Sequence, residues 1–328
     1  MAGEGGARSA AAGMASTLAW MFVSSALIIA NKRVYTSGFP YPMFVTGLGQ
    51  LASAAGGVVL IRLSGKRSRG LPPLGWLIPT LGPLWAVTFL TMWLGNAAYL
   101  HLSVAFIQIF KAMTPAVTLV LGTLAGQERL SFLLFASVML IALGTGGATF
   151  VETGAPSWSA VGAALFVGSS LTEAARVVGL QRLTSTHHFN NLEALVYVSL
   201  PAAALLFGGS LATEGTAALL LGGGRAGAAA ALAPVASELA YAAALSFLVN
   251  LTSFAAISCT GSLTFKVAGC LKNLAVIWYS VAVSHERVSP GQIAGYLVSV
   301  LGFLAYTAAK AAPRAEAAPQ GKAKAKAA

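Results

Sequence analysis

Two lysines, Lys111 and Lys272, lie inside the long apolar runs at residues 103–125 and 262–283. A lysine at the centre of a membrane-spanning helix costs roughly 2.5–3.5 kcal/mol on insertion scales, so it usually faces a cavity or a partner and marks a pathway. One such lysine lies in each half of the chain. We therefore expect a site that holds an anion inside the bilayer. The alternative is that each ammonium group snorkels to the membrane surface.

Polar side chains accompany both lysines at helical spacing, which places them on the same face of each helix. The stripe of the first run consists of Gln108, Lys111, Thr114, Pro115 and Thr118. The stripe of the second consists of Thr264, Ala268, Lys272 and Tyr279. Each stripe predicts a polar line on an otherwise apolar rod, as expected for the wall of a cavity.

Other polar residues in apolar runs have two readings each. Asn250 continues a line with Ser246 and Ser253, yet such amides more often bond one helix to another than bind a ligand. Arg176 either binds substrate or is neutralised by Glu173 three residues earlier. Tyr279 either stacks on a base or sugar or packs against its neighbours. Lys266, four residues from its helix end, is expected to snorkel.

The composition is that of a membrane protein. The chain has 328 residues, of which 57% are hydrophobic and 9% charged, whereas soluble domains carry about 25% charged residues. The net charge of +11 comes from lysines and arginines in short loops and in the C-terminal tail. That distribution is typical of membrane topology and argues against a nucleic-acid partner.

Ten apolar windows are long enough to span a bilayer. They cover residues 14–35, 40–63, 80–101, 103–125, 131–151, 157–180, 191–212, 230–256, 262–283 and 290–310. We predict an all-α polytopic protein with two five-helix repeats, 14–151 and 152–310, between an N-terminal tail at 1–13 and a basic C-terminal tail at 311–328. Most loop lysines and arginines fall on the side of the termini, which places both termini in the cytosol.

The two halves also resemble each other. The motif ERLS at 128–131 returns as ERVS at 286–289, an offset of 158 that Gly144 and Gly302 share. Because five helices per repeat is an odd number, the second half must be inverted relative to the first. Inverted repeats with a site near the bilayer midplane are typical of transporters that work by alternating access.

Enzyme signatures are missing from the sequence. There is no aspartate for a phosphoryl-enzyme, no Walker loop and no Gly-x-Ser-x-Gly motif, and the histidines lie without further ligands nearby. Cys259 and Cys270 lack metal-ligand spacing and are interpreted as small hydrophobic residues. We therefore expect neither an enzyme nor a cofactor, and transport driven by gradients or exchange.

At the level of motifs, the chain resembles the triose-phosphate/nucleotide-sugar translocator family of the drug/metabolite transporter superfamily over residues 14–310. The motifs are NK at 31–32, FPYP at 39–42, VAFIQIFKAMTP at 104–115, EAAR at 173–176 with Gln181, TFKVAGCLKN at 264–273, and Gly295, Tyr296 and Tyr306. The greatest similarity is to plant and algal probable sugar-phosphate/phosphate translocators.

The resemblance implies exchange of phosphorylated solutes, with a lysine on the fourth helix and a Lys-Arg pair on the ninth binding phosphate. Lys111 and Lys272 match the lysines, but Asn273 stands where the arginine would be. Arginine grips phosphate with a bidentate fork that asparagine lacks. This difference shifts the expectation from triose phosphates toward the nucleotide-sugar carriers of the Golgi and endoplasmic reticulum.

The leading hypothesis is an antiporter that exchanges a nucleotide sugar for a nucleoside monophosphate across a lipid bilayer. Its substrate-binding residues would be Lys111, Lys272, Asn273, Gln108, Thr118, Asn250, Tyr279 and Arg176. The alternatives are a sugar-phosphate or phosphoenolpyruvate/phosphate translocator and, in another class, a non-transporting regulatory membrane subunit. The oligomeric state stays open, with a homodimer as one option.

The last five residues suggest a location. Lys324 and Lys326 fit a Lys-x-Lys-x-x retrieval signal of the early secretory pathway, and the alternative is a disordered basic tail. The segment before the first apolar window is short for a plastid transit peptide. We expect a Golgi or endoplasmic reticulum membrane, with the plastid envelope as the alternative.

Overall fold

Helices make up all of the regular secondary structure in the described part of the chain, which in this computed structural model comprises residues 2–64, 73–99, 101–102, 111–153, 159–185, 190–216, 232–272 and 289–311. The α-helices are α1 (Ala2–Thr36), α2 (Pro42–Leu63), α3 (Leu74–Tyr99), α5 (Thr114–Leu124), α6 (Phe132–Thr153), α7 (Ala160–Ser185), α8 (Asn191–Thr213), α11 (Ala236–Thr260) and α13 (Pro290–Ala311). A 3₁₀ turn, η1 (Ala233–Val235), leads into α11, and residues 262–272 are also helical.

Within these ranges, seven helices are long and apolar enough to cross a membrane: α1, α2, α3, α7, α8, α11 and α13. The other three predicted windows contain the short apolar helix α5, the helix α6 with its apolar stretch Phe132–Ala148, and the helical residues 262–272. The all-helical membrane class is therefore confirmed. The predicted total of ten spans depends partly on residues 103–110 and 273–288, which lie outside the described residues.

Two helix starts differ from the prediction. The N-terminal tail is helical from Ala2 and continues into the first span without a break. The third helix begins at Leu74 rather than at residue 80, with Pro79 and Pro83 inside it. Proline inside a soluble helix would mark a break, but membrane helices tolerate it when neighbouring groups satisfy the freed carbonyls. Pro79 thus lies inside the helix, although it precedes the predicted window.

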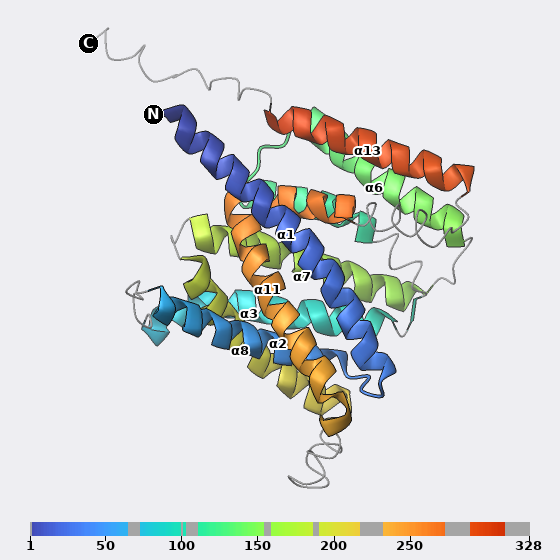
Figure 1. Ribbon diagram of the computed structural model, residues 1–328. Coiled ribbons are helices and arrows are strands. Elements are labelled where there is room, and N and C mark those ends of the chain that lie inside the picture. The colour runs from blue at the N-terminus through green and yellow to red at the C-terminus, as the bar shows by residue number, and fades with distance from the viewer. Residues whose placement is uncertain are drawn as a thin grey trace.

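The helices pack in pairs, each joining an early helix to a late one. The most extensive packing is between α6 and α13, α2 and α8, α1 and α11, and α3 and α7. In Figure 1, α13 runs along α6 at one end of the molecule, and α11 crosses α1. No pair of this kind lies within one half of the chain, so the two halves interlock throughout the described part.

The crossing of α6 and α13 depends on glycine. A Cβ atom added at Gly144 would lie 2.5 Å from the backbone nitrogen of Ser299, and one added at Gly302 would lie 2.8 Å from the backbone nitrogen of Ile141. Any larger residue would push the helices apart. Small residues are the common means by which membrane helices approach closely.

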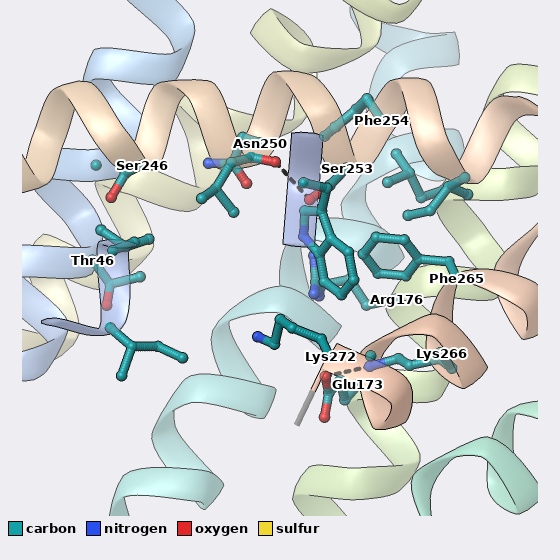
Figure 2. Close-up of a pocket in the computed structure, with 18 of the residues that line it drawn as sticks. Thr46, Glu173, Arg176, Ser246, Asn250, Ser253, Phe254, Phe265, Lys266 and Lys272 are labelled. Atoms are coloured by element: carbon teal, nitrogen blue, oxygen red, sulfur yellow. Dashed lines mark hydrogen bonds and ion pairs between the residues drawn. The ribbon is translucent and has the colours of Figure 1, made fainter. Parts of the chain in front are cut away.

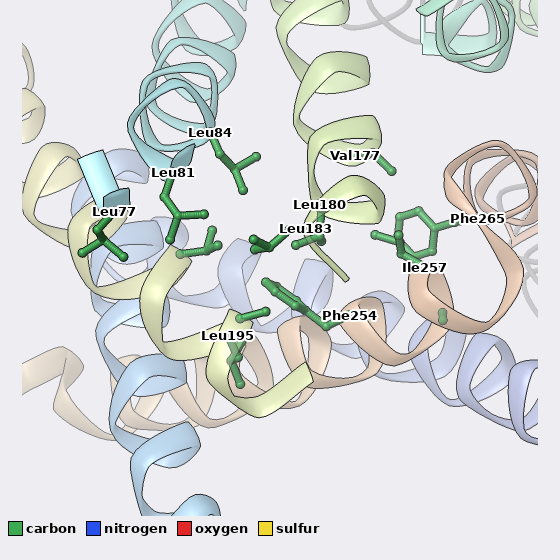
Figure 3. Packing of buried hydrophobic residues seen from close by; sticks show 13 residues of the cluster. Leu77, Leu81, Leu84, Val177, Leu180, Leu183, Leu195, Phe254, Ile257 and Phe265 are labelled. Carbon is green, nitrogen blue, oxygen red and sulfur yellow. The ribbon is translucent and has the colours of Figure 1, made fainter. Parts of the chain in front are cut away.

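A hydrophobic cluster lies where α3, α7, α8, α11 and residues 262–272 meet (Figure 3). It includes Leu81 of α3, Val177 of α7, Leu195 of α8, Ile257 of α11 and Phe265, all of them buried. Because Ile257 and Phe265 also line the main cavity, this cluster forms part of the support behind the cavity wall.

Glu214 ties the end of α8 to the start of α2. Its carboxylate accepts hydrogen bonds from the backbone N–H groups of Met43 (2.6 Å) and Phe44 (3.2 Å), and Ser210 donates to it at 2.7 Å. The first N–H groups of a helix have no partner within the helix, and a carboxylate is favoured at that end by the helix dipole. The segment that follows α8 thus contains a cap for another helix.

Candidate functional site

A cavity of about 660 Å³ lies between the helices of the two halves (Figure 2). Its wall is formed by α1, α2, α5, α7, α11 and residues 262–272, with one contribution from α3. Ligand pockets in proteins commonly measure about 300–1,000 Å³. The cavity is therefore large enough for a small organic molecule, and both halves of the chain contribute to it.

Charged side chains gather on one part of this wall. The described lining includes four cationic residues and a single carboxylate: Lys111, Arg176, Lys266, Lys272 and Glu173. Lys111 immediately precedes α5, α7 carries Glu173 and Arg176, and both other lysines belong to residues 262–272. Figure 2 shows the charged groups facing Ser246, Asn250 and Ser253 on α11. The surplus of positive charge makes this a cavity for an anion.

Lys266 forms an ion pair with Glu173. The expectation that Lys266 snorkels is wrong, since its side chain is only 11% exposed and lines the cavity. The pairing of Glu173 with Arg176 is likewise replaced by the pairing with Lys266. A buried charge without a partner strongly destabilises the fold. The opposite charge for Lys266 comes from α7, which lies beside residues 262–272. Residue spacing along one helix cannot show that these two helices are neighbours.

Lys272 enters the same cavity from another face of its helix. Its ammonium group donates to Ser24 at 3.3 Å and lies 5.4 Å from the centre of the Trp20 ring. Trp20 in turn packs on Phe265 with ring centroids 4.2 Å apart. Both contacts of Lys272 are weak, which leaves its charge available to a ligand. Sequence reasoning missed Trp20 and Ser24, although their spacing of four residues places them on one helix face.

Two buried polar atoms at the cavity have no hydrogen-bond partner within the described residues. They are Nε of Arg176 and Oδ1 of Asn31, and both residues line the cavity. Leaving a buried donor or acceptor unpaired costs about 1–3 kcal/mol, more for charged groups. One atom is a cationic donor and the other a neutral acceptor, so together they suit a ligand that carries both an anionic group and hydroxyls.

Asn250 combines both roles considered for it. It lines the cavity, and its amide donates to Ser53 of α2 at 2.9 Å. Ser53 donates in turn to the carbonyl of Gly49 at 2.7 Å. The amide therefore holds α11 against α2 at the edge of the cavity.

Thr118 lies away from the cavity lining. It is fully buried, and its hydroxyl donates to the carbonyl of Thr114 at 2.9 Å. The preceding turn provides the lining instead, through Thr114 and Pro115. Glu238 of α11 accepts a hydrogen bond from Ser237 at 2.8 Å.

Three further predicted site residues, Gln108, Asn273 and Tyr279, lie outside the described residues. Across the ranges that are described, no group of three or more histidines, cysteines or acidic residues is arranged to hold a metal ion. The polar groups of the cavity lining are hydrogen-bonding side chains, four cationic side chains and the carboxylate of Glu173.

Comparisons with known proteins found relatives over nearly the whole chain. The model of the Triose-phosphate Transporter family matches residues 12–307. A probable sugar phosphate/phosphate translocator of Arabidopsis thaliana is 29% identical over 297 residues, covering 88% of this chain and 84% of that protein. A second translocator of the same description and organism is 27% identical over 306 residues, covering 89% and 81%. A solved crystal structure with 14% identity superposes with a TM-score of 0.65 over 94% of this chain and 99% of the other, a likeness of fold alone.

Proposed function

Because the chain belongs to the Triose-phosphate Transporter family, we propose that it is a membrane antiporter that exchanges a sugar phosphate for inorganic phosphate. The observation that carries this proposal is the cavity with four cationic side chains against one carboxylate. The two Arabidopsis relatives are described as probable sugar phosphate/phosphate translocators, which supports phosphate as the counter-substrate. This reverses the order of the two hypotheses formed from the sequence.

In this proposal the phosphate group binds between the two halves. Lys111 contacts it from the first half and Lys272 from the second, and the unpaired Nε of Arg176 supplies a further charge-assisted donor. Neutralising these charges would allow the halves to close around the substrate and reopen on the other side. An empty cavity keeps its repulsion between cations, which favours exchange over a one-way leak.

Two inverted repeats are the architecture that we propose for this movement, and the helix pairs support it. If the ten windows are numbered along the chain, the first pairs with the eighth and the third with the sixth. A shift of five windows converts one of these pairs into the other. The contact of Gly144 with Ser299 likewise becomes that of Gly302 with Ile141 at the offset of 158 found in the sequence.

A nucleotide-sugar antiporter is the second candidate. It is favoured by Asn273, which stands where related phosphate carriers have an arginine. The deciding experiment is exchange by the purified protein in liposomes preloaded with phosphate or with a nucleoside monophosphate. Uptake of labelled sugar phosphate only into phosphate-loaded vesicles would support the proposal. Uptake of nucleotide sugars only into nucleotide-loaded vesicles would refute it in favour of the second candidate.

For the location, we propose an early secretory membrane with both termini in the cytosol, and keep the plastid envelope as the alternative. The support is the pattern of Lys324 and Lys326 in the basic tail, which would serve as a retrieval signal on a cytosolic C-terminus. The test is a fluorescent fusion at the N-terminus, with both lysines intact or changed to serine. Plastid fluorescence, or an unchanged pattern after the substitution, would contradict the proposal.

A further inference from the structure

We propose that Glu173 sets the charge class of the substrate. By occupying Lys266, it leaves a cavity that accepts the phosphate ester of an uncharged sugar and rejects phosphorylated carboxylic acids. This inference rests on the proposed function, because it concerns which phosphorylated compounds the same cavity admits.

The first step is the position of the ion pair. Glu173 and Lys266 both line the cavity, and they come from different helices. The side chain of Glu173 is 32% exposed and that of Lys266 is 11% exposed. The carboxylate is therefore the more open partner, and a ligand that approached Lys266 would meet it.

The second step is the division of the cations. Lys111 lies close enough to Lys272 and to Glu173 for its charge to act on both, and Arg176 also acts on Glu173. The carboxylate thus pairs with Lys266 and lies within electrostatic range of Lys111 and Arg176. A ligand with one phosphate uses those cations. A second acidic group would have to bind beside Glu173 or displace it from Lys266, and like charges in a cavity of low dielectric repel strongly.

The third step is the polar part of the wall. The unpaired Oδ1 of Asn31 is an acceptor and needs a donor from the ligand. Ser246 and Ser253 add hydroxyls on the facing helix. A sugar hydroxyl donates to such acceptors, whereas an ionised carboxylate only accepts. Charge and hydrogen-bonding capacity therefore select the same class of ligand.

The experiment compares two labelled probes, glucose 6-phosphate and phosphoenolpyruvate, in phosphate-loaded liposomes. We expect the wild type to prefer glucose 6-phosphate. Glu173→Gln removes the repulsion and frees Lys266, so the ratio of phosphoenolpyruvate to glucose 6-phosphate uptake should rise by about tenfold or more. Glu238→Gln is the matched control, because Glu238 lies outside the cavity lining and bonds Ser237, and it should leave the ratio unchanged.

A second variant protects the test against misfolding, since Glu173→Gln leaves a buried lysine without its partner. The double variant Glu173→Gln/Lys266→Met removes both charges and keeps the other cations. It loses the repulsion by Glu173 without gaining a free lysine, so its ratio of phosphoenolpyruvate to glucose 6-phosphate uptake should lie between those of the wild type and Glu173→Gln. Equal uptake of both probes by the wild type, or a wild-type ratio in the double variant, would overturn the inference. Failure of the wild type to exchange phosphate for either probe would instead overturn the proposed function beneath it.

Discussion

Lys272→Gln tests whether the buried lysines hold the substrate. The ammonium group has two protein contacts, a 3.3 Å hydrogen bond to Ser24 and the face of Trp20 at 5.4 Å. Neither contact is short, so the folded protein should lose little stability when glutamine replaces the lysine. A charge-assisted hydrogen bond contributes about 1.5–3 kcal/mol, and each 1.4 kcal/mol is a factor of ten. The affinity for phosphate should therefore fall roughly 10- to 150-fold.

The assay is phosphate/phosphate exchange in liposomes, with the half-saturating concentration of labelled phosphate as the readout. Lys310→Gln serves as the control, because Lys310 forms an ion pair with Glu128 at 2.8 Å and does not line the cavity. It should keep the wild-type value. If Lys272→Gln also keeps it, the lysine does not bind the anion and the charge argument is wrong.

Three further substitutions address the scaffold around the cavity. Gly144→Val should destabilise the protein by about 1–3 kcal/mol or more because it forces apart two backbones, seen as a lower Tm in detergent. Glu214→Ala should cost about 1–2 kcal/mol through the lost helix cap, whereas Glu238→Ala should leave the Tm unchanged. Asn250→Ala should lower the Tm by removing the bond to Ser53. Asn250→Asp also loses this N–H donor, and it should in addition weaken phosphate affinity because it adds a negative charge to the cavity wall. Equal affinity in Asn250→Asp and wild type would show that phosphate binds elsewhere.

Much of the architecture could be predicted because membrane helices have a strong compositional signal. Each of the ten apolar windows contains helical residues in the described part of the chain. The cost of placing a charge in hydrocarbon also singled out Lys111, Arg176 and Lys272, and the structure brings all three to one cavity. These inferences depend on one segment at a time, which is the information that a sequence contains directly.

The features that escaped prediction depend on which helices are neighbours. Glu173 has a nearby arginine on its own helix, yet it pairs with Lys266 across a helix boundary. Trp20 looks like an ordinary apolar residue in the sequence, and only the structure shows that Lys272 lies over its ring. Glu214 directly follows α8, and the helix start that it caps, that of α2, lies 171 residues away from it in the chain. In each case the interaction joins residues from different helices, so it depends on the tertiary structure.

The pairing of early with late helices also has a consequence for how the protein is made. During synthesis α1, α2, α3 and α6 enter the membrane before α11, α8, α7 and α13 exist. Their partner-facing surfaces, including the glycine face of α6, must then be covered by lipid or by the insertion machinery until the ribosome reaches the C-terminal helices. Contacts between residues so distant in sequence make assembly slow and late. A chain truncated anywhere before α13 should therefore leave α6 without its partner helix and be degraded by membrane proteases.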